Sequence, residues 1–326
     1  MLATFFGTNS GSRSVVMGPI EHRYDFVYLF DCQDGNPNGD PDAENSPRID
    51  PETLQGLVSD VCLKRKIRNY ISSATTVGDI AQAGYRIFVE SGSTLESRQR
   101  EPFEKWEGPD RPEPKGKDTN PSEVEKARQW MCRNFFDVRA FGAVMSTTAF
   151  NCGQVRGPVQ ITFGRSIDRI LPIEHTISRQ AFTGEKDVKS GTGTFGRKYT
   201  IPYGLYLAHG FINPVFAGKT GFNDADLALL WKALRSLFEQ DRSAARGTMA
   251  ARGLYIFKHE SKLGNAQAQR LFEAIRIEKR PSVESPRAFT DYTVETPDPE
   301  SLPQGVTLID GLAWPDTVIE RGRSSS

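Results

Sequence analysis

Short apolar runs separated by polar, glycine-rich loops predict a chain in which strands and helices alternate. The run over residues 24–30 is aromatic and β-branched and is too short for a helix, which predicts a buried strand. After a polar loop, Asp50 followed by Pro51 is the usual signal for the start of a helix. This helix is expected to end in the basic segment LKRKIR, residues 63–68. Its apolar stripe consists of Leu54, Leu57, Val58 and Val61.

The middle of the chain begins with a second predicted strand over residues 84–89 and continues with a polar, proline-rich insertion. Ser122 and Glu125 match a capping box, which predicts one helix from residue 122 to about residue 145. A short strand is expected to follow over residues 159–163.

The second half of the chain predicts a long hairpin and an amphipathic helix. Two β-like arms, residues 167–182 and 198–212, flank a polar, glycine-rich tip. The helix starts at Asn223 or Asp224 and carries a stripe of large apolar side chains. Further predicted elements are a strand over residues 254–258, a helix over residues 267–274, and short strands over residues 290–295 and 306–309.

This order of elements predicts an α+β fold. It is consistent with a ferredoxin-like β-α-β-β-α-β core that carries large insertions. Residues 1–22 are interpreted as a loose N-terminal extension and residues 281–326 as a partly irregular C-terminal segment. The pattern leaves the pairing of the strands open.

Charge balance and cysteine usage narrow the class of protein. Lys plus Arg and Asp plus Glu number 41 each, which argues against nucleic-acid binding by bulk charge but not against a local basic face. The four Cys residues lack metal-ligand or disulfide spacing, so we expect free thiols, no metal and no other cofactor. No apolar run reaches the length of a membrane span, which predicts a soluble, cytoplasmic protein.

The polar loop after the first strand matches the first half of a calcium-binding EF-hand loop through Asp34, Asn36 and Asn38. The match fails at the twelfth position, which is Asn45 instead of a bidentate Glu, and a strand precedes the loop. Two interpretations remain. The loop is closed by Asx turns, or its backbone and amides approach a phosphate chain.

The basic end of the first helix has two interpretations as well. Cations near a helix C-terminus complement the helix dipole. However, Lys64 and Arg68 are spaced i, i+4 and Arg65 and Arg68 are spaced i, i+3, so that their like charges repel one another. A polyanion that crosses this face would remove the repulsion, which favours RNA contact.

Arg156 lies between two glycines just before a predicted strand. Glycines let a backbone approach a ligand closely, and an Arg side chain offers a fork of donors for phosphate. The alternative is a surface Arg in a turn. Arg139, Arg242 and Arg246 are weaker candidates, and the last two could equally form surface ion pairs.

Signals for catalysis are poor. The four His residues lie in unrelated contexts, and His209, which lies in an apolar run, is interpreted as structural. No GxSxG, HExxH or P-loop motif is present. Asp40 and Asp42 could hold a metal or deprotonate a hydroxyl, but nothing in the sequence requires it.

Several blocks of sequence resemble a known family. The segment YDFVYLFDCQDGNPNGDPDAENSPRIDPETLQGLVSDVCLKRKIRNY resembles the N-terminal signature of the backbone subunit of the type I-C CRISPR surveillance complex, Cascade, a member of the RAMP superfamily. The blocks FDVRAFGAVM, NCGQVRGPVQ, GRKYTIPYGLYLAHGFI and DRSAARG are similar to further blocks of that family, in the same order. The resemblance covers about residues 22–280.

The resemblance implies a hand-shaped protein. Its palm is a modified RRM or ferredoxin-like domain over residues 23–280, with a helical finger insertion over about residues 91–135 and a hairpin thumb over about residues 166–200. Copies would stack as a filament along one CRISPR RNA and present it for pairing with target DNA. The other implied partners are an RNA-processing subunit, a large PAM-recognising subunit and a helicase-nuclease recruited after target binding.

The motif positions and the resemblance together give a set of predicted RNA-binding residues. They are Asn36, Asn38, Lys64, Arg65, Arg68, Arg139, Gln154, Arg156, Arg197, Lys198, Arg242 and Arg246. We expect no enzymatic activity and no catalytic residue. The alternative is a metal-dependent endoribonuclease, because related type III backbone subunits cut RNA with an Asp in the loop after the first strand, where this chain has Asp40 and Asp42.

Overall fold

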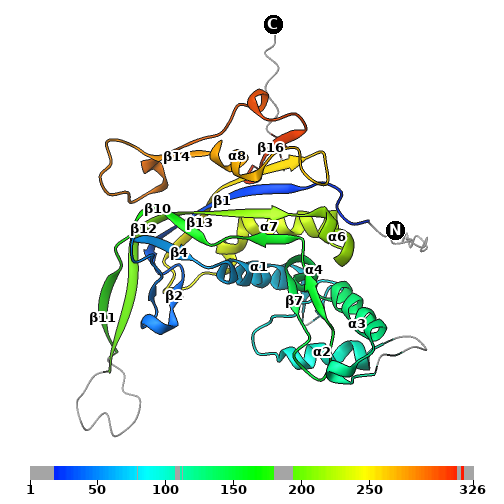
Figure 1. The fold of residues 1–326 in the computed structure, drawn as a ribbon. Coiled ribbons are helices and arrows are strands. Elements are labelled where there is room, and N and C mark those ends of the chain that lie inside the picture. Colours follow the sequence, from blue (N-terminus) through cyan, green and yellow to red (C-terminus); the bar gives the residue numbers. More distant parts are fainter. Residues whose placement is uncertain are drawn as a thin grey trace, which may run out of the picture.

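The structure is a computed structural model that describes residues 18–78, 80–106, 111, 113–179, 194–313 and 317–318. A central antiparallel sheet organises the chain, with helices on both faces (Figure 1). This arrangement confirms the expected mixture of helices and strands. No helix among the described residues is long and apolar enough to cross a membrane.

The sheet is built around strand β1 (Tyr24–Gly35), which pairs along its length with β12 (Thr194–Ile212) on one side and β13 (Thr248–His259) on the other. The strand order is β17-β16-β13-β1-β12-β10-β4. β9 and β11 also pair with β12. The remaining strands of this sheet are β4 (Gln55–Val58), β9 (Val159–Ile161), β10 (Gly164–Arg169), β11 (Ile173–Arg179), β16 (Val306–Asp310) and β17 (Thr317–Val318).

Two amphipathic helices, α1 (Asp60–Thr75) and α7 (Asp224–Gln240), pack against each other and cover one face of the sheet. Their apolar stripes meet the aromatic side chains of β1, where the Phe26 and Trp231 rings lie edge to face with centroids 5.3 Å apart. Such a contact adds to the free energy gained by burying the two rings. Asn223 and Asp226 form a capping box at the start of α7.

The opposite face of the sheet is covered by α8 (Ala268–Glu273) and by the hairpin of β14 (Arg276–Lys279) and β15 (Tyr292–Glu295). Val27 of β1 and Leu271 and Phe272 of α8 belong to this second layer. Because β1 is buried on both faces, its residues do not alternate between apolar and exposed polar side chains as they would in a half-buried strand.

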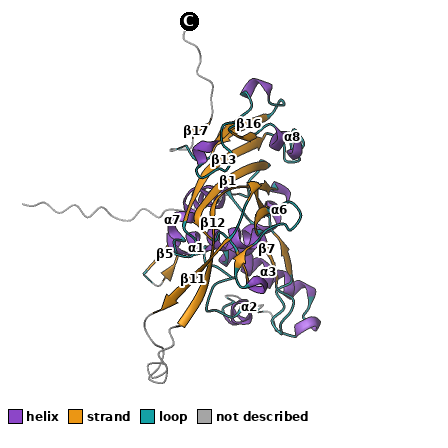
Figure 2. Ribbon diagram, turned by 90° about the vertical axis from the view of Figure 1, so that its left-hand side faces the viewer, coloured by secondary structure: helices purple, strands orange, loops and turns teal. Residues whose placement is uncertain are grey.

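A separate small core lies in the insertion between β6 and β9, where Phe88, Phe103, Met131 and Phe135 are buried together. The insertion and the β11–β12 hairpin project to the same side of the sheet (Figures 1 and 2). The elements of the insertion are α2 (Leu95–Glu104), η2 (Gly116–Asp118), α3 (Pro121–Asn134), α4 (Phe136–Phe141), β7 (Gly142–Val144) and β8 (Gln154–Arg156).

The remaining elements are short and lie in the connections. They are β2 (Gly39–Asp40), η1 (Pro41–Ala43), β3 (Ser46–Pro47), β5 (Thr76–Val77), β6 (Ile80–Ala81), α6 (Pro214–Thr220), η3 (Phe289–Asp291) and η4 (Pro299–Ser301).

Most of the strongly patterned segments form the predicted elements. The first strand, the hairpin arms, the helix from Asp224, the strand over residues 254–258 and the short helix near residue 270 are all present. The last residues of the first predicted arm, 180–182, residues 183–193 of the predicted tip, and residues 1–17 of the predicted N-terminal extension lie outside the described residues.

The predicted start of the first helix is wrong. Asp50 and Pro51 lie in a turn, and the next residues form β4, which pairs with β10 at the edge of the sheet. Helix α1 begins after Ser59, whose hydroxyl accepts a hydrogen bond from the Cys62 N–H. Leu54, Leu57, Val58 and Val61 have the spacing of an apolar helix face. Leu57 and Val58 nevertheless form part of β4, because they pair with β10 in the sheet.

The long helix predicted from Ser122 is two helices. Phe135 is extended, with φ −118° and ψ 114°, and forms an isolated bridge with Arg86. That bridge is also the only strand-like pairing of residues 84–89 among the described residues, so the predicted second strand is wrong. Asn120, with Pro121 at the first helical position, caps α3 in place of Ser122.

Gly210 is required by the close approach of β1. A Cβ at Gly210 would lie 1.9 Å from the Phe26 ring, and both residues are paired in the sheet. We expect Gly210→Ala to destabilise the protein by about 1–3 kcal/mol, the usual cost of overpacking a core, as measured by urea unfolding.

Gly218 provides the matched control for this measurement. It lies in helix α6, and no atom lies within 4 Å of the position that a Cβ would occupy there, so Gly218→Ala should stabilise the protein slightly through helix propensity. Equal effects of the two substitutions would contradict the assignment of Gly210 as a packing-limited position.

Candidate nucleic-acid interface

Three segments that are far apart in the sequence converge where β1 ends. They are the loop after β1, the start of β12, and the loop of residues 241–247, which we call the DRSAARG loop. The Asn36 N–H donates to the Ala245 carbonyl at 2.8 Å, and Lys198 Nζ donates to the Ala244 carbonyl at 2.9 Å. The structure therefore brings five predicted residues together, namely Asn36, Arg197, Lys198, Arg242 and Arg246.

Gly35 allows this close approach. A Cβ at Gly35 would lie 2.0 Å from the Arg246 carbonyl oxygen, which is backbone and has no room to move aside. The same carbonyl accepts a hydrogen bond from Cys32 Sγ at 3.5 Å. The DRSAARG loop is thus held against the end of β1 by its backbone, while Arg242 at its outer side stays 69% exposed.

The charged side chains of this region are exposed to different degrees. Arg242 and Arg197 are 69% and 60% exposed, and they pair with Glu239 and with Glu44 at 3.1 Å, respectively. Arg246 is 36% exposed and pairs with Asp241 through one guanidinium nitrogen. Surface pairs of this kind contribute little to stability and exchange readily for another anion.

The two Asn residues of the loop after β1 are partly engaged in closing it. Asn36 Nδ2 donates to the Asn45 carbonyl at 2.7 Å, whereas its buried Oδ1 has no hydrogen-bond partner among the described residues. Asn38 Oδ1 accepts from both the N–H and the hydroxyl of Ser59, at 2.8 and 2.9 Å. Asn38 therefore fixes the loop to the start of α1.

The prediction that the first helix ends in its basic segment is wrong, because residues 63–68 lie in the first half of α1, which continues to Thr75 and has no basic residue in its last turn. The side chains of this basic segment are divided between exposed and engaged ones. Lys64 Nζ pairs with Asp60 at 2.9 Å, and Arg68 Nε donates at 2.8 Å to Asp137, a buried carboxylate. Arg65 is exposed and has no ion-pair partner among the described residues. Internal partners thus relieve much of the like-charge repulsion that the sequence suggests, and Arg65 is the cation of the three that is open to a ligand.

A second group lies near the contact between α1 and α4, from which the chain continues into β7. The cationic ends of Lys64 and Arg68 lie over the Phe141 ring, at 5.9 and 5.3 Å from its centroid. The next residue after Phe141 pairs with Arg156 on β8, which also carries the exposed Gln154. The Arg156 guanidinium lies 4.4 Å from the centroid of the Phe216 ring.

Arg139 lies in the interior and is excluded from the candidate surface. Its guanidinium forms two hydrogen bonds with Asp226, at 2.8 and 2.7 Å, and donates to the carbonyl oxygens of Gly84 and Cys132. Only 8% of the Arg139 side chain is exposed. These partners use its donors within the fold, where it ties α4 to the start of α7.

In the loop after β1, the carboxylate of Asp40 shapes a turn to which Asp42 contributes its backbone N–H. Asp40 Oδ1 accepts from the Asp42 N–H at 3.2 Å, and Asp40 Oδ2 pairs with Arg48 at 3.2 Å. Within the described part of the chain, no three or more His, Cys, Asp or Glu side chains are grouped so that they could hold a metal ion. The geometry agrees with the interpretation of an Asx-type turn.

The cysteines and His209 have the structural roles expected from the sequence. All four Cys residues are free thiols, and burial raises the pKa of Cys152 to about 12. The His209 ring stacks on Phe272 with centroids 4.2 Å apart, and burial lowers the pKa of His209.

Lys66 is a residue that the sequence interpretation missed. Its side chain is 1% exposed and its Nζ donates to Asp241 in the DRSAARG loop. A signal was present, because Lys66 lies three residues after Leu63 and four before Tyr70, both of which face the core. The helical spacing therefore places Lys66 on the buried side of α1, unlike the neighbouring Arg65, which is exposed.

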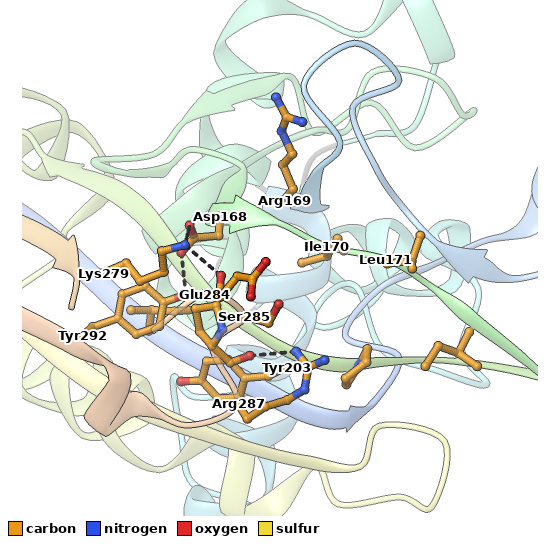
Figure 3. A pocket seen from close by; sticks show the side chains of 15 residues that line it. Asp168, Arg169, Ile170, Leu171, Tyr203, Lys279, Glu284, Ser285, Arg287 and Tyr292 are labelled. Carbon is orange, nitrogen blue, oxygen red and sulfur yellow. Dashed lines mark hydrogen bonds and ion pairs between the residues drawn. The ribbon is translucent and has the colours of Figure 1, made fainter. Parts of the chain in front are cut away.

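A cavity of about 530 Å³ lies away from these groups, between β10, β12 and the β14–β15 hairpin (Figure 3). Tyr292 donates to Asp168 at 2.7 Å, and Lys279 donates to the Glu284 carbonyl at 2.9 Å. None of the predicted RNA-binding residues lines this cavity. Among its charged side chains, Lys279 and Asp168 form an ion pair at 3.9 Å, and Arg287 donates to the Pro286 carbonyl at 3.0 Å.

Comparison with known proteins agrees with the resemblance. The model of the family CRISPR-associated protein Cas7 matches residues 22–297. A CRISPR-associated protein Cas7 of Haloferax volcanii is 24% identical over 315 residues, which cover 89% of this chain and 86% of that protein.

Solved chains match as well, among them two chains of CRISPR RNA-guided surveillance complexes. One, from a CRISPR RNA-guided surveillance complex described as pre-nicking, has 16% identity and a TM-score of 0.45 and covers 72% of this chain and 78% of its own. The other, from a CRISPR RNA-guided surveillance complex, has 13% identity and a TM-score of 0.42 and covers 72% and 68%.

The family match identifies the chain as a CRISPR-associated protein. Within that class the chain belongs to the Cas7 family, since the family model extends over most of its length. This confirms the sequence-based identification of a CRISPR RNA-binding backbone subunit in CRISPR defence.

The buried position of Arg139 predicts a stability effect. Arg139→Ala would leave Asp226 buried without its charged partner, so we expect a loss of about 3–5 kcal/mol in urea unfolding. Arg242→Ala, at an exposed position, should stay within about 0.5 kcal/mol of the parent protein. Similar losses in both variants would contradict the assignment of Arg139 to the core.

Proposed function

We propose that this Cas7 chain holds CRISPR RNA on two basic groups on the α1 side of the sheet. The first comprises Arg197, Lys198, Arg242 and Arg246 around the DRSAARG loop, and the second comprises Arg65 on α1 with Gln154 and Arg156 on β8. The observation that carries the proposal is the convergence of the first group from two distant segments, β12 and the DRSAARG loop, beside the loop that follows β1. Phosphate contacts of this kind hold RNA independently of its sequence.

Three of the predicted RNA-binding cations are left out of the proposed contacts because they already have partners within the fold. Lys64, Arg68 and Arg139 have internal carboxylates, at 2.9, 2.8 and 2.7 Å. Lys64 and Arg68 border the second group across Phe141 and support its shape, whereas Arg139 supports the core. Asn38 orients the loop at the start of α1, and Asn36 closes it through the hydrogen bond to the Asn45 carbonyl, so both support the surface from within.

We further propose the hand-shaped division of the chain. The strand order β13-β1-β12-β10, with α1 and α7 on one face, supports an RRM-like or ferredoxin-like palm. The separate core around Phe103 and Met131 supports a finger insertion, and the projecting β11–β12 hairpin supports a thumb. Copies of the chain would stack along one RNA, which adds avidity to a weak individual grip.

The finer assignments rest on the sequence blocks. They favour a type I-C complex in which this subunit works in the cytoplasm with an RNA-processing subunit, a large PAM-recognising subunit and, after target DNA is bound, a helicase-nuclease. A zero net charge suits a protein that combines basic grooves with faces that meet a neighbouring subunit.

We propose a binding role without catalysis. The carboxylate of Asp40 is paired with Arg48 and caps the 3-10 turn η1, which gives it a structural task. The alternative endoribonuclease would need Asp40 or Asp42 within reach of a scissile phosphate or its 2′-hydroxyl, or on a metal held there.

Removal of cations from the DRSAARG region should weaken RNA binding. We expect the variant Lys198→Ala, Arg242→Ala, Arg246→Ala to lower affinity for CRISPR RNA and to flatten its salt dependence. Each lost phosphate contact should reduce the log–log slope by roughly 0.7, or about 2 in total. The measurement is binding of end-labelled CRISPR RNA by the full chain across a salt series.

A matched variant on the other face separates specific contacts from total charge. Arg276→Ala, Lys279→Ala, Arg287→Ala removes the same charge beside the β14–β15 hairpin. It should leave the slope unchanged. Equal slopes for the two triple variants would show that the DRSAARG region is not the RNA-binding surface.

The enzymatic alternative is tested with the assembled complex, a complementary labelled RNA and Mg²⁺. We expect tight pairing and no cutting, because among the described residues neither carboxylate belongs to a group of three His, Cys, Asp or Glu side chains that could hold a metal, and Asp40 is paired with Arg48. Asp40→Ala and Asp42→Ala should therefore leave the RNA equally intact. Periodic cleavage that either substitution abolishes would make this chain an enzyme.

A further inference from the structure

Lys66 is a buried cation beneath the DRSAARG loop. It lies on α1 with 1% of its side chain exposed, pairs with Asp241, and places its Nζ 5.6 Å from the centroid of the Phe238 ring. Burial lowers the pKa of Lys66, while its hydrogen bond with Asp241 acts in the opposite direction. No part of this side chain is available to touch an RNA strand.

A buried ion pair of this kind is a weak source of stability. The desolvation of two charges costs several kcal/mol, and well-packed apolar side chains of similar size are often as stable or more stable. Lys66 occupies a site that Met would fill, between Leu63, Ile67 and the aromatic ring of Phe238. Its charge therefore points to a task other than stability.

That task is visible in the partners of Asp241. The same carboxylate oxygen, Oδ2, accepts from both Lys66 Nζ and Arg246 Nη1. Asp241 is 14% exposed, whereas Arg246 is 36% exposed at the edge of a cavity of about 250 Å³ lined by the DRSAARG loop. Without Lys66, the full negative charge of Asp241 would face Arg246 alone.

We propose that Lys66 is a positioning residue that neutralises Asp241 and so keeps the Arg246 guanidinium available for RNA phosphate. Asp241 then acts as an anchor that orients Arg246 through one nitrogen and leaves its remaining donors without a partner in the described part of the chain. The inference rests on the proposed RNA-binding role of the DRSAARG loop and adds a buried residue that works without contact with the RNA.

The experiment compares a single and a double variant of the full chain in their binding to an end-labelled, unstructured single-stranded RNA. Lys66→Met should lower affinity roughly fivefold, the effect of about one uncompensated charge near a phosphate. It should also reduce the log–log salt slope by roughly 0.7, because Arg246 is then retained by Asp241. Lys66→Met with Asp241→Asn removes both charges and should restore the affinity and the slope.

Three further measurements decide between positioning and simple loss of structure. Urea unfolding should show both variants folded under the binding conditions, and Lys279→Met, which breaks an ion pair on the other face, should not change RNA binding. Weak binding by both the single and the double variant would overturn the proposal in favour of a structural role. If Arg246→Ala weakens binding but Lys66→Met does not, only this inference fails; if Arg246→Ala has no effect, the proposed surface fails with it.

Discussion

The double-sided burial of β1 is the constraint on which the rest of the structure depends. Residues 24–32 of this strand are all buried, because long strands flank it on both edges and layers of helix and hairpin cover both faces. A strand enclosed in this way has a fixed register and a fixed end. The loops that leave the sheet at Gly35 and return near Thr248 therefore meet at one place, which is where the candidate interface lies.

Charge in this protein is mostly balanced at short range. Buried carboxylates such as Asp25, Asp31 and Asp137 each have a cation or a histidine within hydrogen-bond distance. The zero net charge therefore combines two kinds of basic residue: some pair with buried carboxylates inside the fold, and others are exposed at the surface. Composition reports only the sum of the two groups, and contact geometry is needed to separate them.

The sequence predicts the elements whose pattern depends on their own residues. The aromatic strand at Tyr24 and the capped helix from Asp224 carry strong local signals, and both form as expected. The helix start at Asp50 and the unbroken helix through Phe135 fail, because pairing with β10 and with Arg86 overrides local preference.

The same limit applies to the candidate site. Motif spacing points to the DRSAARG loop, but it does not separate Arg139, which bonds Asp226, from Arg242, which faces outward. The distinction depends on residues 87 positions away along the chain, which no local pattern reports. Long-range partners therefore decide which of the predicted cations are open to a ligand.

Strand β12 carries a mechanical consequence. Its 19 residues run without interruption from the projecting hairpin, where Thr194–Thr200 pair with β11, into the sheet, where Ile201–Ile212 pair with β1. A continuous strand offers no hinge between the two regions. The direction in which the hairpin projects is therefore set by the twist of the sheet. A force applied to the hairpin would act along β12 on the part of the sheet beside the candidate interface.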